Sequence, residues 1–208
     1  MSRLLGRTTS INVRKVLWTL AEVGEPFTHE ADWASPAAPT RTPAFLDLNP
    51  NGLVPVYHDE RGVLWQSSTI CRYLARKHDR DDLLPTDPAA AAVVEMWMDW
   101  QASELNTAWT YAFMALVRGA DDYRDADLVG RSIDRWTGMM LILDDQLAAT
   151  QRFAAGATFT VADIVLGLSA HRYFSTPFEH APLPAVRLWM QRLADETRFA
   201  EFATADTP

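Results

Sequence analysis

The polar stretch "RTTSIN", residues 7–12, carries the side chains of this chain most suited to chemistry. Thr8, Thr9, Ser10 and Asn12 stand in front of an apolar pattern typical of an amphipathic helix. A helix start requires one capping side chain, whose oxygen accepts a backbone N–H two or three residues further on. Two interpretations therefore remain open: Ser10 acts only as the N-cap, or the group faces a ligand at the positive end of the helix.

A second polar helix start lies in the segment "WQSSTI". Ser67, directly after Gln66, begins a helical pattern over residues 67–78. The unpaired backbone N–H groups at such a helix start can bind an anion. The alternative is that Ser67 is a plain helix cap. The segment "FTVADI" has a different character. Its Thr160 and Asp163 have the spacing of a capping box, which predicts a structural helix start.

The elements that must position these residues alternate between strand and helix patterns. The strand patterns "RLLG" and "PFTHEA" flank a helix pattern over residues 12–23, which Gly24 ends. A short helix in "PAFLDL", a hairpin of "VPVYHDE" and "VLW", and the helix at 67–78 follow. Because a crossover favours parallel pairing and a hairpin antiparallel pairing, this order predicts a small α/β domain with a mixed sheet.

The remainder of the chain shows helical periodicity and no strand pattern. The segment "DRDDLLPTDP" interrupts the first part with charges and prolines. The helical segments that follow are 88–117, 125–147, 161–173 and 184–195. We therefore predict an α/β domain at 1–79, a linker at 80–87 and an all-helical domain at 88–208.

Composition and charge disfavour several classes of function. The net charge is −8, divided as +1 through Asp79 and −9 beyond it, which argues against a nucleic-acid partner. No apolar run approaches the length that spans a bilayer and the first residues lack a signal-peptide pattern, so we expect a cytoplasmic protein with no membrane partner. One cysteine, Cys71, excludes a disulfide within the chain, and the five histidines lack ligand spacing, so we expect no metal.

Five motifs in register resemble those of the cytosolic glutathione S-transferases. They are "NPNGLVPVYHD" (49–59), "WQSSTICRYLARKH" (65–78), "LLPTD" (83–87), "FTVADI" (159–164) and "PAVRLWMQRL" (184–193). The opening "GRTTSINVRKVLWTLAEVG" is similar to that of bacterial members with a Ser/Thr-type active site. The resemblance spans essentially the whole chain. It implies a thioredoxin-like α/β N-terminal domain followed by an all-α C-terminal helical bundle domain, a homodimer, and glutathione as co-substrate in detoxification.

The chemistry that the resemblance implies is activation of the glutathione thiol. A thiol of this kind has a pKa of about 8.5, whereas the thiolate is the nucleophile. Lowering the pKa by two units requires about 2.7 kcal/mol. A hydroxyl donor contributes about 1.5–3 kcal/mol and the helix dipole about 0.3–1 kcal/mol. The resemblance makes Ser10 the first candidate donor and Thr9 the second, with Asn12 helping to hold the sulfur.

The resemblance also implies how the remainder of glutathione is held. Val54, before a cis Pro55, pairs its main chain with the cysteinyl part. Ser67 and Gln66 contact the γ-glutamyl end, where many members have Glu in place of Gln66. That replacement keeps a hydrogen bond but loses a charge against the ammonium group of the ligand.

The remaining contacts of glutathione and the electrophile are less constrained by the sequence. The glycine carboxylate requires a donor from the loop before "FLDLNP", for which Arg41 and Thr40 are candidates. An electrophile pocket would be lined from the first long helix of the second domain, where Trp100, Trp109 and Phe113 are candidates. Aromatic residues at helical spacing also serve as core or dimer contacts.

A cysteine-based chemistry is disfavoured. Some relatives carry a Cys at the first-strand site, where this chain has Thr9 and Ser10. Cys71 instead lies inside the helix at 67–78, which predicts a buried structural thiol. We therefore expect a glutathione S-transferase that activates the thiolate for attack on a small apolar electrophile. The alternatives are a glutathione-dependent peroxidase, disulfide reductase or isomerase on the same site, and a non-catalytic binding or assembly protein with this fold.

Overall fold

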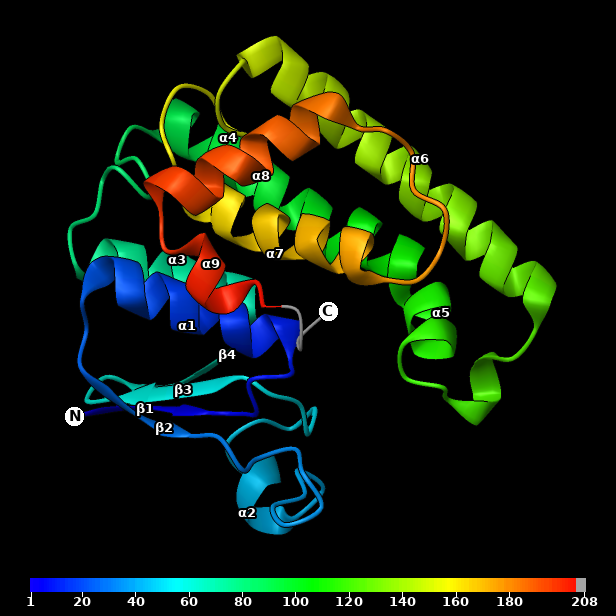
Figure 1. Ribbon diagram of the computed structural model, residues 1–208. Helices are drawn as coiled ribbons and strands as arrows, with labels where there is room; N and C mark the ends of the chain where they lie inside the picture. The colour runs from blue at the N-terminus through cyan, green and yellow to red at the C-terminus, as the bar shows by residue number, and fades with distance from the viewer. Residues whose placement is uncertain (205–208) are drawn as a thin grey trace.

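The computed structural model describes residues 1–204, and its first part is built on a four-stranded sheet (Figure 1). The strands are β1 (Ser2–Leu5), β2 (Phe27–Glu30), β3 (Val56–Asp59) and β4 (Gly62–Trp65), in the order β2-β1-β3-β4. β1 pairs with β2 in parallel, with Ser2 opposite Phe27, whereas β3 is antiparallel to both β1 and β4. The mixed sheet predicted from the sequence is therefore confirmed.

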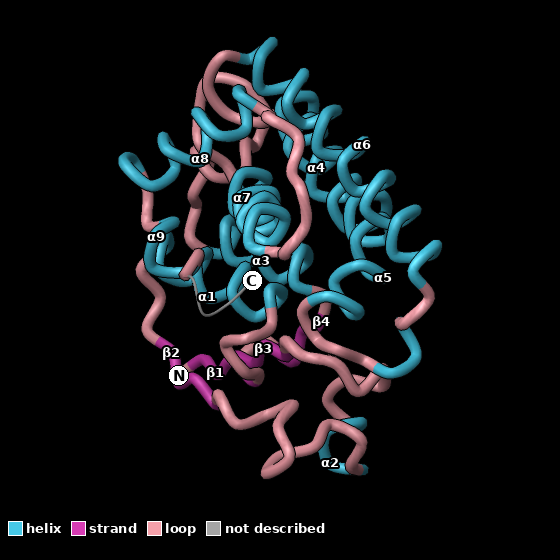
Figure 2. The backbone as a smooth tube through the Cα atoms, turned by 45° about the vertical axis from the view of Figure 1, so that its right-hand side comes forward, coloured by secondary structure: helices cyan, strands magenta, loops and turns pink. Residues whose placement is uncertain are grey.

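Helices cover both faces of this sheet. They are α1 (Ile11–Val23), α2 (Pro43–Leu46) and α3 (Ser67–Lys77). Because successive side chains of a strand point to opposite faces, Leu4 and Tyr57 join the core that α1 and α3 form, whereas Leu5 and Val56 pack with Phe45 of α2. Figure 2 shows the strands as a layer between α2 and the other helices.

The second part of the chain is helical, as predicted. Its elements are α4 (Pro88–Trp100), the π-helix η1 (Gln101–Leu105), α5 (Asn106–Leu116), the 3₁₀-helix η2 (Asp121–Tyr123), α6 (Ala126–Thr150), α7 (Val161–Ser175), α8 (Pro184–Glu196) and α9 (Phe199–Phe202). The sequence predicts one helix over 88–117, and the structure interrupts it with η1. The short η2 and α9 were not predicted. Over residues 1–204, no helix combines the length and apolar character needed to cross a membrane.

Helix α7 lies at the centre of the helical part, where it contacts α1, α4 and α8 (Figure 1). All residues from Val161 to Ala170 are buried, as expected of a helix surrounded by protein. The helical part also packs on the α/β part, since the Trp18 ring of α1 lies 5.8 Å from Phe159 and 5.5 Å from Phe199. One apolar core therefore runs from α1 and α3 into the helical part.

The predicted capping box forms at the start of α7. The backbone N–H of Thr160 donates to Oδ2 of Asp163 at 3.0 Å, and so does the Thr160 hydroxyl. The other carboxylate oxygen accepts from the N–H of Ala154 at 2.9 Å and from Nε1 of Trp189 at 3.0 Å. Asp163 is fully buried. Its carboxylate thus joins α7 to α8 and to the turn before α7.

Candidate active site

The backbone of Ser10 occupies the N-cap position of α1, but its side chain does not cap the helix. Ser10 is extended, with φ −84° and ψ 120°, and makes no side-chain cap hydrogen bond. Its carbonyl oxygen accepts the N–H of Arg14 at 3.0 Å, and its own N–H donates to the carbonyl oxygen of Arg7 at 3.1 Å. The Ser10 hydroxyl therefore stands half-buried at the positive end of α1 without the role of a cap.

The start of α3 is joined to the start of α1. The hydroxyl of the buried Ser67 donates to Oδ1 of Asn12 at 3.3 Å. Gln66, at the N-cap of α3, is exposed. Its backbone has φ 73° and ψ 107°, a conformation that residues other than glycine rarely adopt. Such backbone strain costs about 1–3 kcal/mol and is concentrated at functional sites. The hydrogen bond thus places Asn12 beside Ser67, with Gln66 directly before Ser67 in the chain.

Gly6, between β1 and α1, allows a third segment to approach. The Val54–Pro55 peptide bond is cis, as the resemblance implied. A Cβ on Gly6, whose φ is +141°, would lie 2.8 Å from Cβ of Val54 and 2.5 Å from Cγ2 of Val13. Only glycine fits this backbone conformation and this space. The absence of a side chain at Gly6 therefore lets the segment at Val54 lie against α1.

The loop with Arg41 lies beside the same segment. The Thr40 hydroxyl donates to the carbonyl oxygen of Gly52 at 2.7 Å. The Arg41 side chain runs over Gly52, because a Cβ built there would lie 3.1 Å from Cδ and Nε of Arg41. Thr40 therefore holds the loop, whereas the exposed Arg41 lies over Gly52, which is two residues before Val54 in the chain.

The structure brings together two of the three aromatic candidates. The rings of Trp109 and Phe113, both on α5, are 5.3 Å apart. The guanidinium of Arg172 lies 4.5 Å from the Trp109 ring and 4.0 Å from the Phe113 ring. Among the described ring contacts, Trp100 pairs with Trp97 at 5.2 Å on the preceding helix α4. Trp100 is thus placed apart from the other two by the π-helix η1.

Arginines near the start of α1 were not predicted as site residues. Nη2 of Arg118 donates to the carbonyl oxygen of Thr9 at 3.3 Å, and Nη1 of Arg14 donates to that of Phe202 at 2.9 Å. Burial and then Arg118 lower the pKa of Arg14 to about 10. Burial, Arg14 and Arg118 lower the pKa of Arg172 to about 9. The sequence offers no spacing signal for this group, because the fold assembles it from distant segments.

Behind the site, a buried polar chain joins the two parts of the molecule. Nζ of Lys15 donates to Oε1 of Gln101 at 2.7 Å, and Nε2 of Gln101 donates to the Ser169 hydroxyl at 3.0 Å. Burial lowers the pKa of Lys15 to about 7. Cys71 is buried beside it, and burial raises the pKa of its thiol to about 11, as expected of a structural cysteine.

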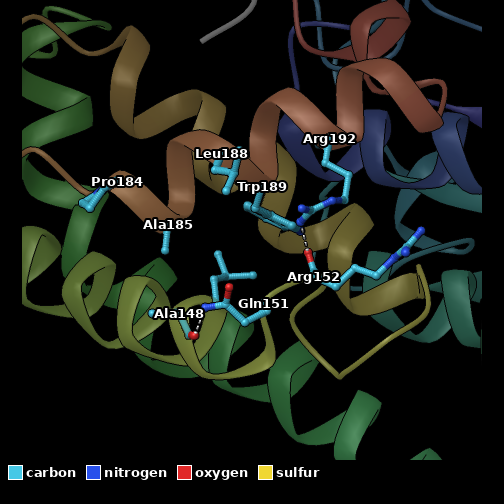
Figure 3. A pocket seen from close by; sticks show the side chains of 9 residues that line it. Ala148, Gln151, Arg152, Pro184, Ala185, Leu188, Trp189 and Arg192 are labelled. Carbon is cyan, nitrogen blue, oxygen red and sulfur yellow. Dashed lines mark hydrogen bonds between the residues drawn. The ribbon is translucent and has the colours of Figure 1, made fainter.

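A cavity of about 250 Å³ between α6 and α8 is separate from this site (Figure 3). Leu188 and Trp189 line it, and its two arginines are engaged with protein groups. Nη1 of Arg192 donates to the carbonyl oxygen of Arg152 at 2.8 Å, and Arg152 pairs with Glu196 at 3.1 Å. Within residues 1–204, no group of three or more His, Cys, Asp and Glu side chains is placed to hold a metal ion.

These features define a class of protein: a thioredoxin-like α/β part with a cis-proline segment and two converging helix starts, followed by a helical part. Residues 9–77 match the family described as Glutathione S-transferase, N-terminal domain. The chain is 33% identical over 208 residues to glutathione S-transferase GstB of Escherichia coli (strain K12), covering 94% of each. It is 31% identical over 215 residues to glutathione S-transferase 3 of Zea mays, covering 98% of this chain and 93% of that protein.

Solved structures give the same result. The theta class glutathione S-transferase from the citrus canker pathogen Xanthomonas axonopodis pv. citri, with glutathione bound, superposes with a TM-score of 0.89. It is 32% identical in sequence, and the match covers 98% of this chain and 97% of that chain. The chain described here belongs to the glutathione S-transferase family, and the two curated relatives named above are transferases.

Proposed function

We propose that this chain is an enzyme that binds glutathione, converts its thiol to the thiolate and transfers it to an electrophile with an apolar body. The observation that carries the proposal is the Ser10 side chain, which lies at the start of α1 and makes no cap hydrogen bond. Its hydroxyl is available to donate to the glutathione sulfur. Thr9 is the second candidate donor, and Asn12 helps to hold the sulfur.

In this proposal the thiol proton passes to solvent when glutathione binds, and the thiolate remains. A charge-assisted hydrogen bond from Ser10 and the positive end of α1 stabilise the negative sulfur. The sulfur then forms a C–S bond with the electrophilic carbon, and the leaving group departs with the electrons of the bond that breaks; in an addition, the displaced π electrons take up a proton from solvent instead. Ser10 keeps its own proton throughout, so no general base is required.

The remaining residues bind the two ends of glutathione. The main chain of Val54, at the cis bond to Pro55, pairs with the cysteinyl part. Gln66 and Ser67 hold the γ-glutamyl end at the start of α3, and the strained backbone of Gln66 supports this role. Arg41 contacts the glycine carboxylate. A related enzyme solved with glutathione bound supports glutathione as the ligand.

The electrophile packs against the half-buried Trp109, and Phe113, whose ring lies 5.3 Å from that of Trp109 and is only 3% exposed, supports it from the protein side. Trp100 is a weaker lining candidate, because it packs with Trp97 instead. We assign the α/β domain to residues 1–79, the linker to 80–87 and the helical domain to 88–208.

The chain works as a cytoplasmic homodimer in detoxification. Exposed apolar side chains on β4 and α4 are consistent with a contact between two copies: Trp65, Val93 and Met96. The dimer would bury these side chains, which a monomer leaves in water.

Calorimetric titration with glutathione at neutral pH, in two buffers of different ionisation enthalpy, tests the proposal. It gives the affinity and the number of protons released together. Binding with substantial proton release is expected, because the bound thiol becomes a thiolate. Binding without release would favour another glutathione-dependent activity, which panels of electrophiles, hydroperoxides and disulfides would identify. No binding would favour a non-catalytic role.

A further inference from the structure

Four arginines from four segments of the chain gather around the start of α1. Arg7 lies in the turn after β1, Arg14 on α1, Arg118 just after α5 and Arg172 on α7. Arg118 donates to the carbonyl oxygen of Thr9 at 3.3 Å. This contact places a guanidinium one residue from Ser10, the proposed thiol-activating residue.

The same arginines contact the aromatic rings that line the proposed electrophile side. The guanidinium of Arg118 lies 5.3 Å from the centroid of the Phe113 ring. Arg172 lies 4.0 Å from the same ring and 4.5 Å from that of Trp109. Cationic groups and apolar faces therefore occupy the same small region beside the thiol site.

The two outer arginines leave an excess of positive charge there. Arg7 and Arg118 are exposed, and no ion pair joins either of them to a carboxylate anywhere in the 204 described residues. Burial lowers the pKa of Arg118, and the nearby Arg7 lowers it further. Arg118 in turn lowers the pKa of Arg14 and Arg172. An anion placed between Arg7 and Arg118 would relieve the repulsion between these two side chains.

We propose that the electrophile of this enzyme carries a carboxylate next to its apolar body, and that Arg118, assisted by Arg7, recognises the carboxylate. This inference rests on the proposed function. Trp109, which is half-buried and backed by Phe113, packs against the apolar body. The planar guanidinium of arginine matches a carboxylate with two parallel hydrogen bonds. The bond from Arg118 to the carbonyl oxygen of Thr9 holds this guanidinium beside the residue that precedes Ser10.

A second role for the arginines must be separated from this one. Positive charge near Ser10 also favours the glutathione thiolate, and this effect is independent of the electrophile. Loss of an arginine would then slow the reaction with every electrophile by the same factor. Loss of carboxylate recognition would instead slow the reaction with an anionic substrate more than the reaction with a neutral substrate of the same shape, so the ratio of the two kcat/KM values would change.

The test uses 4-chloro-3-nitrobenzoate and 4-chloro-3-nitrobenzamide as matched electrophiles with glutathione. In both reactions the sulfur forms a bond to the ring carbon, the C–Cl bond breaks, and chloride leaves with the bonding electrons. The thiol proton goes to solvent. The measured quantity is the ratio of kcat/KM for the benzoate to that for the benzamide, each divided by its uncatalysed rate.

The ratio is expected to exceed one in the unaltered enzyme and to fall about tenfold or more in Arg118→Gln. The ratio for Arg118→Lys, which keeps the charge but not the planar guanidinium, should lie between the ratios of the unaltered enzyme and of Arg118→Gln. Arg124→Gln is the matched control, because Arg124 is exposed and pairs with Asp121 on the nearby η2. Its ratio should equal that of the unaltered enzyme.

A ratio at or below one in the unaltered enzyme, or an equal loss with both substrates in Arg118→Gln, would overturn the inference and leave the proposed function in place. Turnover of the benzamide by each variant shows that the variant is folded. Failure of the unaltered enzyme to turn over either substrate, together with no proton release on glutathione binding, would overturn the proposed function and the inference with it.

Discussion

Ser67 and Asn12, which are 55 residues apart in the chain, meet through a hydrogen bond of 3.3 Å between their side chains. The bond joins the first turn of α3 to the first turn of α1. Each helix start carries backbone N–H groups without partners within the helix, and a partial positive charge. Two such ends side by side favour a ligand with negative groups at both its sulfur and its carboxylate end, which is the charge pattern of bound glutathione thiolate.

Replacing Ser10 by Ala should lower kcat about 10- to 150-fold, because the thiolate loses a hydrogen bond of about 1.5–3 kcal/mol. The ultraviolet absorbance of bound thiolate, followed against pH, should show a raised pKa of the glutathione thiol. Thermal stability should change little, since the Ser10 side chain does not cap α1. Thr9→Ala is the comparison variant. If Thr9→Ala lowers kcat more than Ser10→Ala does, the sulfur is held by Thr9 instead.

Replacing Gly6 by Ala should lower the free energy of unfolding by about 2 kcal/mol or more and weaken glutathione binding. The new Cβ would overlap Val54 and Val13, and the backbone φ of +141° disfavours any side chain. Gly62→Ala is a matched control, because Gly62 has a similar φ of +135° with no atom within 4 Å of the added Cβ. Urea denaturation of both variants isolates the cost of crowding. Equal losses would mean that the close approach at Gly6 contributes nothing.

Replacing Asp163 by Ala should lower the free energy of unfolding by about 3–5 kcal/mol. The change leaves the N–H groups of Ala154, Thr160 and Trp189 without their buried acceptor. Asp195→Ala, at an exposed position of α8, should change stability by no more than about 0.5 kcal/mol. Denaturant unfolding measures both variants. A small effect in Asp163→Ala would show that water reaches the three donors.

Lys15 should make the free energy of unfolding rise as the pH increases from about 7 toward 10.5. Burial lowers its pKa to about 7 in the folded protein, from an ordinary value of 10.5. Between these values the unfolded chain holds a proton that the folded chain does not, so a higher pH favours the folded state. Each unit of difference between the folded and the unfolded pKa of Lys15 contributes about 1.4 kcal/mol to the free energy of unfolding.

Urea denaturation of the unaltered protein and of Lys15→Met at several pH values checks this expectation. The variant should lose most of the rise, because methionine cannot titrate. The neighbouring Cys71 thiol opposes the rise above about pH 9, because burial raises its pKa to about 11 and the unfolded thiol loses its proton first. Both proteins contain Cys71, so the difference between their curves reports Lys15. Parallel curves for the two proteins would show that Lys15 stays protonated in the folded state.

The order of strands and helices followed from the sequence because apolar periodicity and glycine or proline breaks are local properties. The helix starts near Ser10 and at Ser67 were expected from the same local pattern, whereas the contact of Asn12 with Ser67 was not predicted, because it joins segments 55 residues apart. The grouping of the arginines was not predicted from the sequence, because Arg14, Arg118 and Arg172 come together only through the packing of distant segments. The π-helix was also not predicted from the sequence, because the apolar pattern continues on both sides of it.

The π-helix η1 separates the aromatic residues of the continuous helical stretch from α4 to α5 into two groups. A π-helix closes its hydrogen bonds over five residues instead of four, so it places one extra residue in the path of the chain. Since each residue of a helix turns by about 100°, the phase of α5 shifts relative to α4 by about that angle. Trp97 and Trp100 pair on one side of the shift, and Trp109 and Phe113 meet Arg172 on the other. Deleting one residue between Gln101 and Leu105 should therefore turn a different row of α5 side chains toward the start of α1 and change the surface that α5 presents there.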